Sequence, residues 1–340
     1  GTLVANAIFE LKMNQQLGND AFAILYRTNA QSRSFEEALR RLNIPYRIYG
    51  GLSFYQRKEV KDLLAYFRLT INNKDEDALT RVINYPIRGI GQTTVERILV
   101  RAKEKGVSTW EVVSDPFSYA LDVNAPTRQR LISFATMIRS FSVQTESKNA
   151  YELARLIATS SGIMKDLQED QSPEGVSRIE NIEELLNAIS EFMESPAPLT
   201  EDGQIPKPFR TLDEFMQDVA LITDAEDKDK QDRNHVSLMT VHAAKGLEFP
   251  HVFIVGMEEN LFPSFQSLNN RSDLEEERRL FYVAITRGMR TVTLSYAENR
   301  YRWGDLISAD PSRFINEIDE QFIEMPKKGT IAGSVDDMRK

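Results

Sequence analysis

HVSLMTVHAAKGLEFPHVFIVG, residues 235–256, is the stretch that decides the fold of this chain. Two apolar runs of strand length, 235–241 and 251–256, flank a polar segment that contains a glycine. The second run is almost continuously apolar, as is typical of a strand covered on both sheet faces. A helical pattern at 275–287 and a further apolar run at 291–297 follow it. This alternation predicts a parallel sheet with helices on its faces.

The beginning of the chain shows the same alternation. An apolar run at 21–26 precedes Phe35, Ala38, Leu39 and Leu42, whose spacing is that of one helical face, and a second strand is expected at 44–49. The sequence therefore predicts an α/β fold in which one sheet is built from both ends of the chain.

The middle of the chain differs from both ends. Helical periodicity dominates and strand patterns are scarce, while prolines between 196 and 208 and charges at 224–234 indicate loops. We therefore predict a split α/β domain, a mostly α-helical insertion and a flexible tail. The split domain comprises 1–52 and 233–325, the insertion comprises 53–232, and the tail comprises 326–340.

Composition excludes several kinds of site. With no cysteine there can be no disulfide or thiolate ligand, and with three histidines we expect no metal site. No apolar run approaches the ~20 residues of a membrane span, no signal peptide is evident, and we expect a cytoplasmic protein. The net charge of −9 argues mildly against nucleic acid. However, basic residues outnumber acidic ones in 53–105, and the acidic excess lies in 106–232, so DNA remains compatible with the charge distribution.

The segment 239–249 carries the most chemistry, because it leaves one strand and precedes another. It supplies a hydroxyl, an imidazole, an ammonium group, a glycine and a carboxylate, from Thr240, His242, Lys245, Gly246 and Glu248. Ligands of α/β sheets bind at the carboxyl ends of strands, where we expect this segment to lie. A solvated turn is an equally good interpretation of the same residues.

The helix at 275–287 ends in Arg287. An arginine that closes an apolar helical face is typical of phosphate binding, although a C-terminal arginine on a helix dipole gives the same pattern. Glu275, Glu276 and Glu277 could suggest a metal site, but we interpret them as first-turn acidic residues at a helix N-terminus.

Two further segments place polar groups beside a turn. Arg27 and Asn29 follow the strand at 21–26 and could meet a phosphate backbone, or could simply cap a helix. The glycine turn RGIGQTTVERI, 88–98, leads into a helix expected to start at Thr93 or Thr94. Its amides would suit a phosphate, and a plain interhelical turn would use the same glycines.

Together these segments resemble the C-terminal half of UvrD/Rep/PcrA-type superfamily 1 DNA helicases. The resemblance covers roughly residues 20–320, with its motifs in the order found in the family. It is carried by ILYRTNAQSRSFEEALRRLNIPYRIYGG, FYQRKEVKDLLAYFRL, PIRGIG, MTVHAAKGLEFPHVFIVGMEE and EEERRLFYVAITR.

The resemblance implies a RecA-like domain, called 2A, interrupted by a 2B insertion. It also implies ATP and Mg²⁺ shared with N-terminal helicase domains 1A and 1B, and single-stranded and duplex DNA as partners. Within motif V, Thr240 and His242 would contact single-stranded DNA, Gly246 would lie near the γ-phosphate, and Glu248 would bond the ribose. Arg287 of motif VI would be an arginine finger.

By the same resemblance, Arg27 and Asn29 would touch the single strand. The duplex would be held by Arg88, Gly89, Gly91 and Thr94. The implied activity is that of an ATP-dependent 3′-to-5′ DNA helicase, in which coupling runs along the short segment from His242 to Glu248. Repair or replication proteins are expected as further partners.

The sequence also departs from that family. It has no G-x-x-x-x-G-K-[ST] segment, no Walker B acidic pair in the family's context, and it begins with Gly1 rather than methionine. We therefore expect a fragment of a longer helicase that does not hydrolyse ATP alone. The alternative is a stand-alone, non-catalytic DNA-binding or protein-interaction module. A helicase–nuclease fusion has no support in the acidic residues.

Overall fold

The computed structural model describes residues 1–195, 209–224, 234–302 and 305–324, and the chain forms two compact units. Unit 1 comprises Gly1–Phe54, Asp229–Arg300 and Leu306–Lys340; unit 2 comprises Tyr55–Lys228 and Tyr301–Asp305. The predicted proline-rich loop, most of the predicted charged linker and the predicted tail lie outside the described residues.

Unit 1 is built on a five-stranded sheet with the order β2-β3-β1-β4-β5, and every neighbouring pair is parallel. The strands are β1 (Phe22–Tyr26), β2 (Tyr46–Tyr49), β3 (Val236–Thr240), β4 (Phe249–Ile254) and β5 (Gly288–Leu294). The sequence prediction of a parallel sheet drawn from both ends of the chain is thus confirmed.

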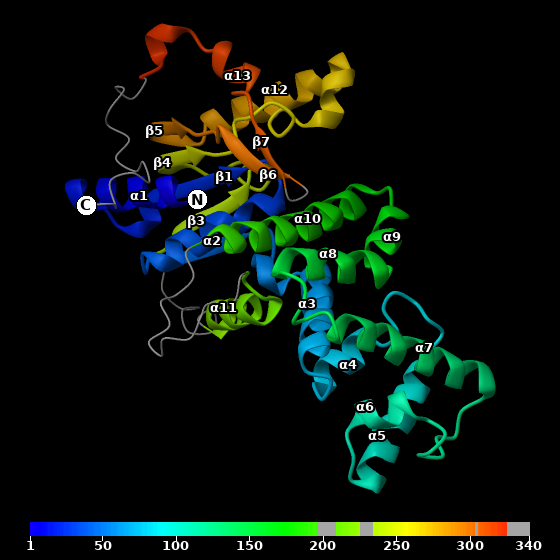
Figure 1. Ribbon diagram of the computed structural model, residues 1–340. Helices are drawn as coiled ribbons and strands as arrows, with labels where there is room; N and C mark the ends of the chain where they lie inside the picture. The colour runs from blue at the N-terminus through cyan, green and yellow to red at the C-terminus, as the bar shows by residue number, and fades with distance from the viewer. Residues whose placement is uncertain (196–208, 225–233, 303–304, 325–340) are drawn as a thin grey trace. The chain divides into compact units, whose positions relative to one another are not determined.

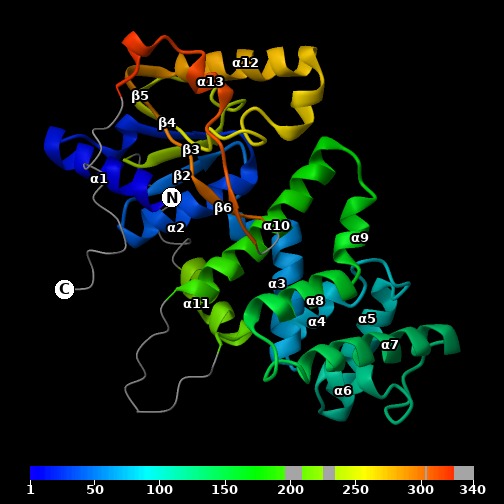
Figure 2. The ribbon, with the colours of Figure 1, turned by 45° about the horizontal axis from the view of Figure 1, so that its top comes forward.

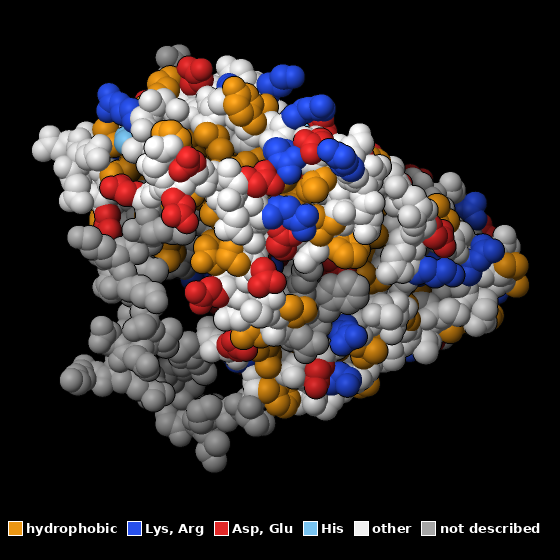
Figure 3. Space-filling model, turned by 90° about the horizontal axis from the view of Figure 1, so that it is seen from above, with side chains coloured by type: hydrophobic (Ala, Val, Ile, Leu, Met, Phe, Trp, Pro, Cys, Tyr) orange, Lys and Arg blue, Asp and Glu red, His pale blue; other side chains and the backbone are white. Residues whose placement is uncertain are grey.

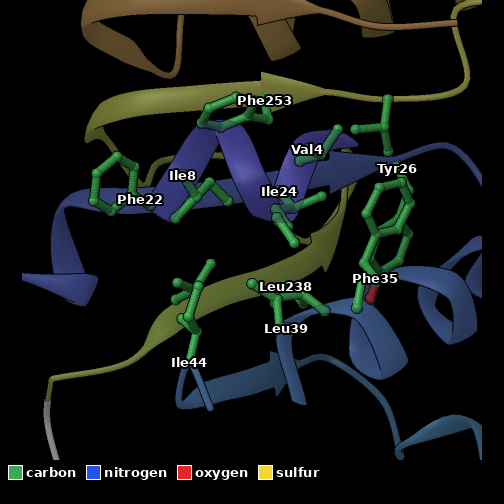
Figure 4. Packing of buried hydrophobic residues seen from close by; sticks show 14 residues of the cluster. Val4, Ile8, Phe22, Ile24, Tyr26, Phe35, Leu39, Ile44, Leu238 and Phe253 are labelled. Atoms are coloured by element: carbon green, nitrogen blue, oxygen red, sulfur yellow. The ribbon is translucent and has the colours of Figure 1, made fainter. Parts of the chain in front are cut away.

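Helices cover both faces of this sheet (Figure 1). On one face, α1 (Thr2–Gln15) and α2 (Ser32–Arg41) pack on Phe22, Ile24 and Tyr26 of β1 (Figure 4). On the other, α12 (Arg271–Ile285) and α13 (Arg313–Asn316) pack with Ala23 and Leu25. Because side chains alternate along a strand, the fully buried β1 supplies both cores.

Two features of unit 1 and one pair of strands divided between the two units were not anticipated. Helix α1 and the hairpin of β6 (Asn299–Arg302) and β7 (Asp305–Ser308) were not predicted. Helix α12 begins at Arg271, where the Asn270 side chain accepts a hydrogen bond from the amide of Ser272. The interpretation of Glu275–Glu277 as first-turn acidic residues is therefore wrong, since they lie in the second turn. Short 3-10 helices complete the unit: η1 (Asn19–Ala21), η2 (Asn29–Gln31), η4 (Phe265–Asn269) and η5 (Glu320–Phe322).

Unit 2 is helical, as the periodicity of the middle region predicted, and its described residues within 55–195 and 209–224 contain no strand. After η3 (Phe54–Gln56), its helices are α3 (Lys58–Ile71), α4 (Glu76–Val82), α5 (Gln92–Lys105), α6 (Thr109–Ser114), α7 (Ala125–Ser142), α8 (Ala150–Ser160), α9 (Ile163–Gln168), α10 (Pro173–Glu194) and α11 (Leu212–Asp224). Helix α10 packs against α3, α8 and α9 (Figure 2). In the described part of the chain, no helix is long and apolar enough to cross a membrane.

Candidate nucleic-acid and nucleotide sites

The carboxyl edge of the sheet brings together four of the predicted site residues. Tyr26, the last residue of β1, is level with Thr240, the last residue of β3. Arg27 and Asn29 therefore leave the sheet beside Thr240 and His242. This is the edge at which parallel sheets bind ligands.

Arg27 does not stand alone at this edge. Its Nη2 lies 2.6 Å from Oε1 of Glu277, and its Nε lies 3.0 and 3.1 Å from the two carboxylate oxygens. The amide and hydroxyl of Ser264 also donate to Glu277, both at 3.4 Å. Only 7% of the Glu277 side chain and 23% of the Arg27 side chain are exposed. The predicted DNA contact is therefore fixed by a bidentate, largely buried ion pair.

Gln31 shapes the same edge; the sequence places it among the polar residues just after β1, but its role as a cap was not predicted. Its Oε1 accepts hydrogen bonds from the amides of Arg27 and Thr28, each at 2.9 Å, within a capping box that Thr28 completes. The side-chain amide packs against Gly256, which has a φ of 68° and where an added Cβ would overlap Gln31 Nε2. The Thr-x-x-Gln spacing at 28–31 was the available signal, because it is the pattern of a capping box.

His242 and Thr240 complete this group. Neighbouring protein atoms reduce the hydration of the His242 ring, and Arg27 repels its proton, so the pKa of His242 lies below its ordinary value. Glu277 and Glu276 act in the opposite direction. Thr240 Oγ1 accepts a hydrogen bond from the amide of Ala243 at 3.3 Å. At neutral pH the exposed imidazole is therefore an uncharged hydrogen-bonding group.

Glu248 and Arg287 lie at the opposite, amino edge of the sheet. Each directly precedes a strand, β4 for Glu248 and β5 for Arg287, and the amide of Phe249 donates to the Arg287 carbonyl at 2.9 Å. Ile254 is level with Leu25, near the carboxyl edge, so Glu248 is six residues, or roughly 20 Å, away from that edge.

The expectation that the whole segment from His242 to Glu248 lies at one strand end is consequently wrong. Because β3 and β4 run parallel, the connection between them must travel from the carboxyl edge back to the amino edge. It does so through a series of turns at 241–246. Thr240 and His242 are thereby separated from Gly246 and Glu248, although the two pairs are adjacent in sequence.

Arg287 lies just beyond α12, which ends at Ile285 with Thr286 as its cap. Its guanidinium donates to the carbonyls of Val283 and Leu247 and to Oγ1 of Thr286, each at 3.0 Å. Among the described residues, no carboxylate pairs with Arg287 and no side chain bonds to Glu248. The amino edge thus presents an oriented cation without a compensating anion, beside an exposed carboxylate.

The glycine turn of unit 2 leads into α5 with Gly91 as the N-cap, so the helix starts at Gln92, slightly before the predicted Thr93 or Thr94. No side chain caps this end, and Gly91 is surrounded by open space. The Thr94 amide is used within the helix, donating to Gly91 at 2.9 Å. The amides available to a ligand are therefore those of the first helical residues.

Arg88 is turned inward from this turn. Its guanidinium donates to the carbonyls of Val82, Pro86 and Ser161 at 3.1, 3.1 and 2.7 Å, and it lies over the rings of Tyr66 and Phe134. Gly89 follows with a φ of 71°. This geometry gives Arg88 a structural role in shaping the turn, and its DNA contact stays a prediction.

Charges of both signs are interspersed over the face shown in Figure 3, without one large basic area. Among the described residues, no group of three or more histidine, aspartate or glutamate side chains is arranged to hold a metal ion.

The class of protein to which this fold belongs is the helicases. The family of the UvrD-like helicase C-terminal domain matches residues 2–299, and the chain belongs to it. It is similar to the ATP-dependent DNA helicase PcrA of Leuconostoc citreum, with 38% identity over 326 residues, which is 96% of this chain and 43% of that protein.

Two further relatives agree. The ATP-dependent DNA helicase PcrA of Staphylococcus epidermidis is 40% identical over 319 residues, covering 93% of this chain and 42% of the relative. DNA helicase II of Haemophilus influenzae is 39% identical over 315 residues, covering 92% and 42% respectively. The chain thus spans less than half the length of the curated relatives it matches.

Proposed function

We propose that this chain is the C-terminal part of an ATP-dependent 3′-to-5′ DNA helicase, with unit 1 as domain 2A and unit 2 as domain 2B. The relatives are named as DNA helicases, and the chain covers 42–43% of their length. ATP and Mg²⁺ would be shared with N-terminal domains 1A and 1B, so this part alone would not hydrolyse ATP.

The observation that carries the proposal is the amino edge of the sheet. Arg287 is held by two backbone carbonyls and has no carboxylate partner among the described residues. A guanidinium oriented in this way can stabilise the charge that develops on a γ-phosphoryl group in transfer. The exposed Glu248 is free to accept hydrogen bonds from a ribose, and the open surroundings of Gly246 allow close approach of a phosphate.

The carboxyl edge would carry the single strand. Arg27 would supply the charge, while Asn29, Thr240 and the uncharged His242 would supply hydrogen bonds. In unit 2, the turn at Gly89 and Gly91, with the first turn of α5 up to Thr94, would receive a duplex phosphate. Arg88 would act by holding this turn in shape.

The test is Arg287→Ala in the complete gene product. We expect DNA-stimulated ATP hydrolysis to fall by about 10³- to 10⁵-fold, the contribution typical of an arginine finger, while single-stranded DNA binding persists. Arg290→Ala is the matched control, because Arg290 is an exposed arginine on β5, the strand that Arg287 directly precedes. Near-normal hydrolysis by Arg287→Ala would overturn the assignment.

A further inference from the structure

Glu277 occupies a position at which a carboxylate is costly. Along α12 it precedes Phe281 by four residues and Ala284 by seven, so it shares their buried face. The Phe281 ring stacks on Phe314 with centroids 5.5 Å apart, and Glu277 itself is only 6% exposed. A buried carboxylate needs full compensation by charge and hydrogen bonds.

The charge that compensates Glu277 comes from Arg27, 250 positions away in sequence, and further hydrogen bonds come from Ser264. The Glu277 carboxylate accepts hydrogen bonds from Nε and Nη2 of Arg27 and from the amide and hydroxyl of Ser264. The second terminal nitrogen of Arg27, Nη1, has no partner among the described residues. A guanidinium bound through two N–H groups of one edge to a single carboxylate has a fixed orientation, so its remaining N–H groups point in a defined direction.

The same helix also ends at the other edge of the sheet. From Glu277 to Ile285 the helix rises roughly 12 Å, and Arg287 is tied to its last turn through the carbonyl of Val283. One rigid element therefore carries a partner of Arg27 near its middle and Arg287 just beyond its end.

We propose that Glu277 is a positioning residue, which acts through Arg27 to fix the DNA contact and ties that contact to the helix leading to Arg287. The proposal rests on the proposed function, because it requires Arg27 to contact single-stranded DNA. Glu277 itself touches neither DNA nor nucleotide in this scheme.

The test is a double-mutant cycle on single-stranded DNA affinity, measured by fluorescence anisotropy with an oligothymidylate in the complete gene product. Glu277→Gln removes the charge with little change of volume and breaks the bidentate pair that fixes Arg27. Because a released arginine must be ordered at the moment of binding, we expect about three- to tenfold weaker binding. In an Arg27→Ala background, the same substitution should change affinity by less than about twofold.

Glu276→Gln is the matched control. Glu276 is the neighbouring acid on α12, but it pairs with Arg279 on the exposed side of the helix, where both side chains are more than 70% exposed. We expect its effect to be small and equal in both backgrounds. If the loss of a negative charge from α12 changed DNA affinity in general, both Glu276→Gln and Glu277→Gln would show it. A positioning role changes affinity only in Glu277→Gln.

Two results would overturn the proposal. Tighter DNA binding by Glu277→Gln would mean that Glu277 competes with DNA for Arg27, and an effect of equal size in both backgrounds would mean that Glu277 does not act through Arg27. If Glu277→Gln fails to fold, Arg27→Lys replaces it, since lysine keeps the charge but cannot make the bidentate pair. The Arg27→Lys variant should then bind DNA as weakly as the Arg27→Ala variant, within about threefold. Binding by Arg27→Lys with wild-type affinity would refute the positioning role.

Failure of the proposed function gives a different result. If the wild-type protein does not bind the oligothymidylate at low salt, or if Arg27→Ala binds as tightly as wild type, the DNA contact itself is absent. If wild type binds the oligothymidylate and Arg27→Ala binds it more weakly, and only the dependence on the background is missing, the helicase assignment stands. The role of Glu277 is then refuted.

Discussion

Replacement of Gly256 by alanine tests the packing that holds the carboxyl edge. Gly256 has a φ of 68°, and an added Cβ would overlap Nε2 of Gln31 and lie 3.0 Å from Leu261 Cδ2. The left-handed conformation costs a residue with a Cβ about 1–2 kcal/mol. Displacement of Gln31 also breaks its hydrogen bonds to the amides of Arg27 and Thr28, each contributing about 0.5–1.5 kcal/mol. The expected loss of stability is therefore about 2–5 kcal/mol.

Gly246→Ala provides the matched control, because Gly246 has a similar φ of 86° but nothing within 4 Å of an added Cβ. It should lose only the conformational part, about 1–2 kcal/mol. Urea denaturation gives the two stabilities. Hydrogen exchange measured by mass spectrometry should show faster exchange of the Arg27 and Thr28 amides in Gly256→Ala alone.

A second substitution at Gln31 should rescue Gly256→Ala. In a Gln31→Ala background the overlap is gone, so the cost of Gly256→Ala should fall to about that of Gly246→Ala. If Gly256→Ala costs no more than Gly246→Ala in the wild-type background, or if the Gln31 background leaves its cost unchanged, the contact between Gln31 and Gly256 does not shape this edge.

Two further predictions concern single side chains. Arg88→Ala removes three hydrogen bonds to backbone carbonyls and should destabilise unit 2 by about 2–4 kcal/mol, whereas Arg130→Ala, at an exposed neighbour with one bond to Gly89, should change stability by about 0.5 kcal/mol or less in urea denaturation. Burial, then the nearby Arg290, lowers the pKa of His251, whose ring is 2.8 Å from Thr291 Oγ1. Because the folded state keeps this ring neutral, its contribution to stability is complete above the ordinary pKa of 6.5 and is lost as pH falls below it. The melting temperature should therefore fall less between pH 7.5 and 5.5 in His251→Phe than in wild type, and an equal fall would contradict the assignment.

The sheet could be predicted because its strands are buried on both faces and so are apolar along their whole length. All five residues of β1 are buried, which makes the run at 21–26 visible in the sequence. Helix α1 could not be predicted in the same way. It buries Val4 and Ile8 but leaves Leu3 and Met13 about 60% exposed, so its apolar residues do not mark one face. Its position depends on tertiary packing that local periodicity does not record.

The residues of the site were found more readily than their arrangement. Polar residues after a buried strand, such as Arg27 and His242, stand out because they follow an apolar run. The extent of α12 was harder to see, because its polar first turn carries no apolar periodicity, and this placed Glu277 in the wrong turn. Its spacing of four and seven residues from Phe281 and Ala284 nevertheless assigns it to the buried face.

Parallel topology explains why sequence neighbours serve different edges. A short connection between β3 and β4 must cross the sheet, so His242 and Glu248 separate by roughly the length of a strand. Conversely, Arg27 and Glu277 meet although they are 250 positions apart in sequence. A route between the two edges can therefore run along the helix that holds Glu277 and leads to Arg287, as well as along the loop. The two routes make different predictions, since only the first requires the charge of Glu277, and the double-mutant cycle with Arg27 distinguishes them.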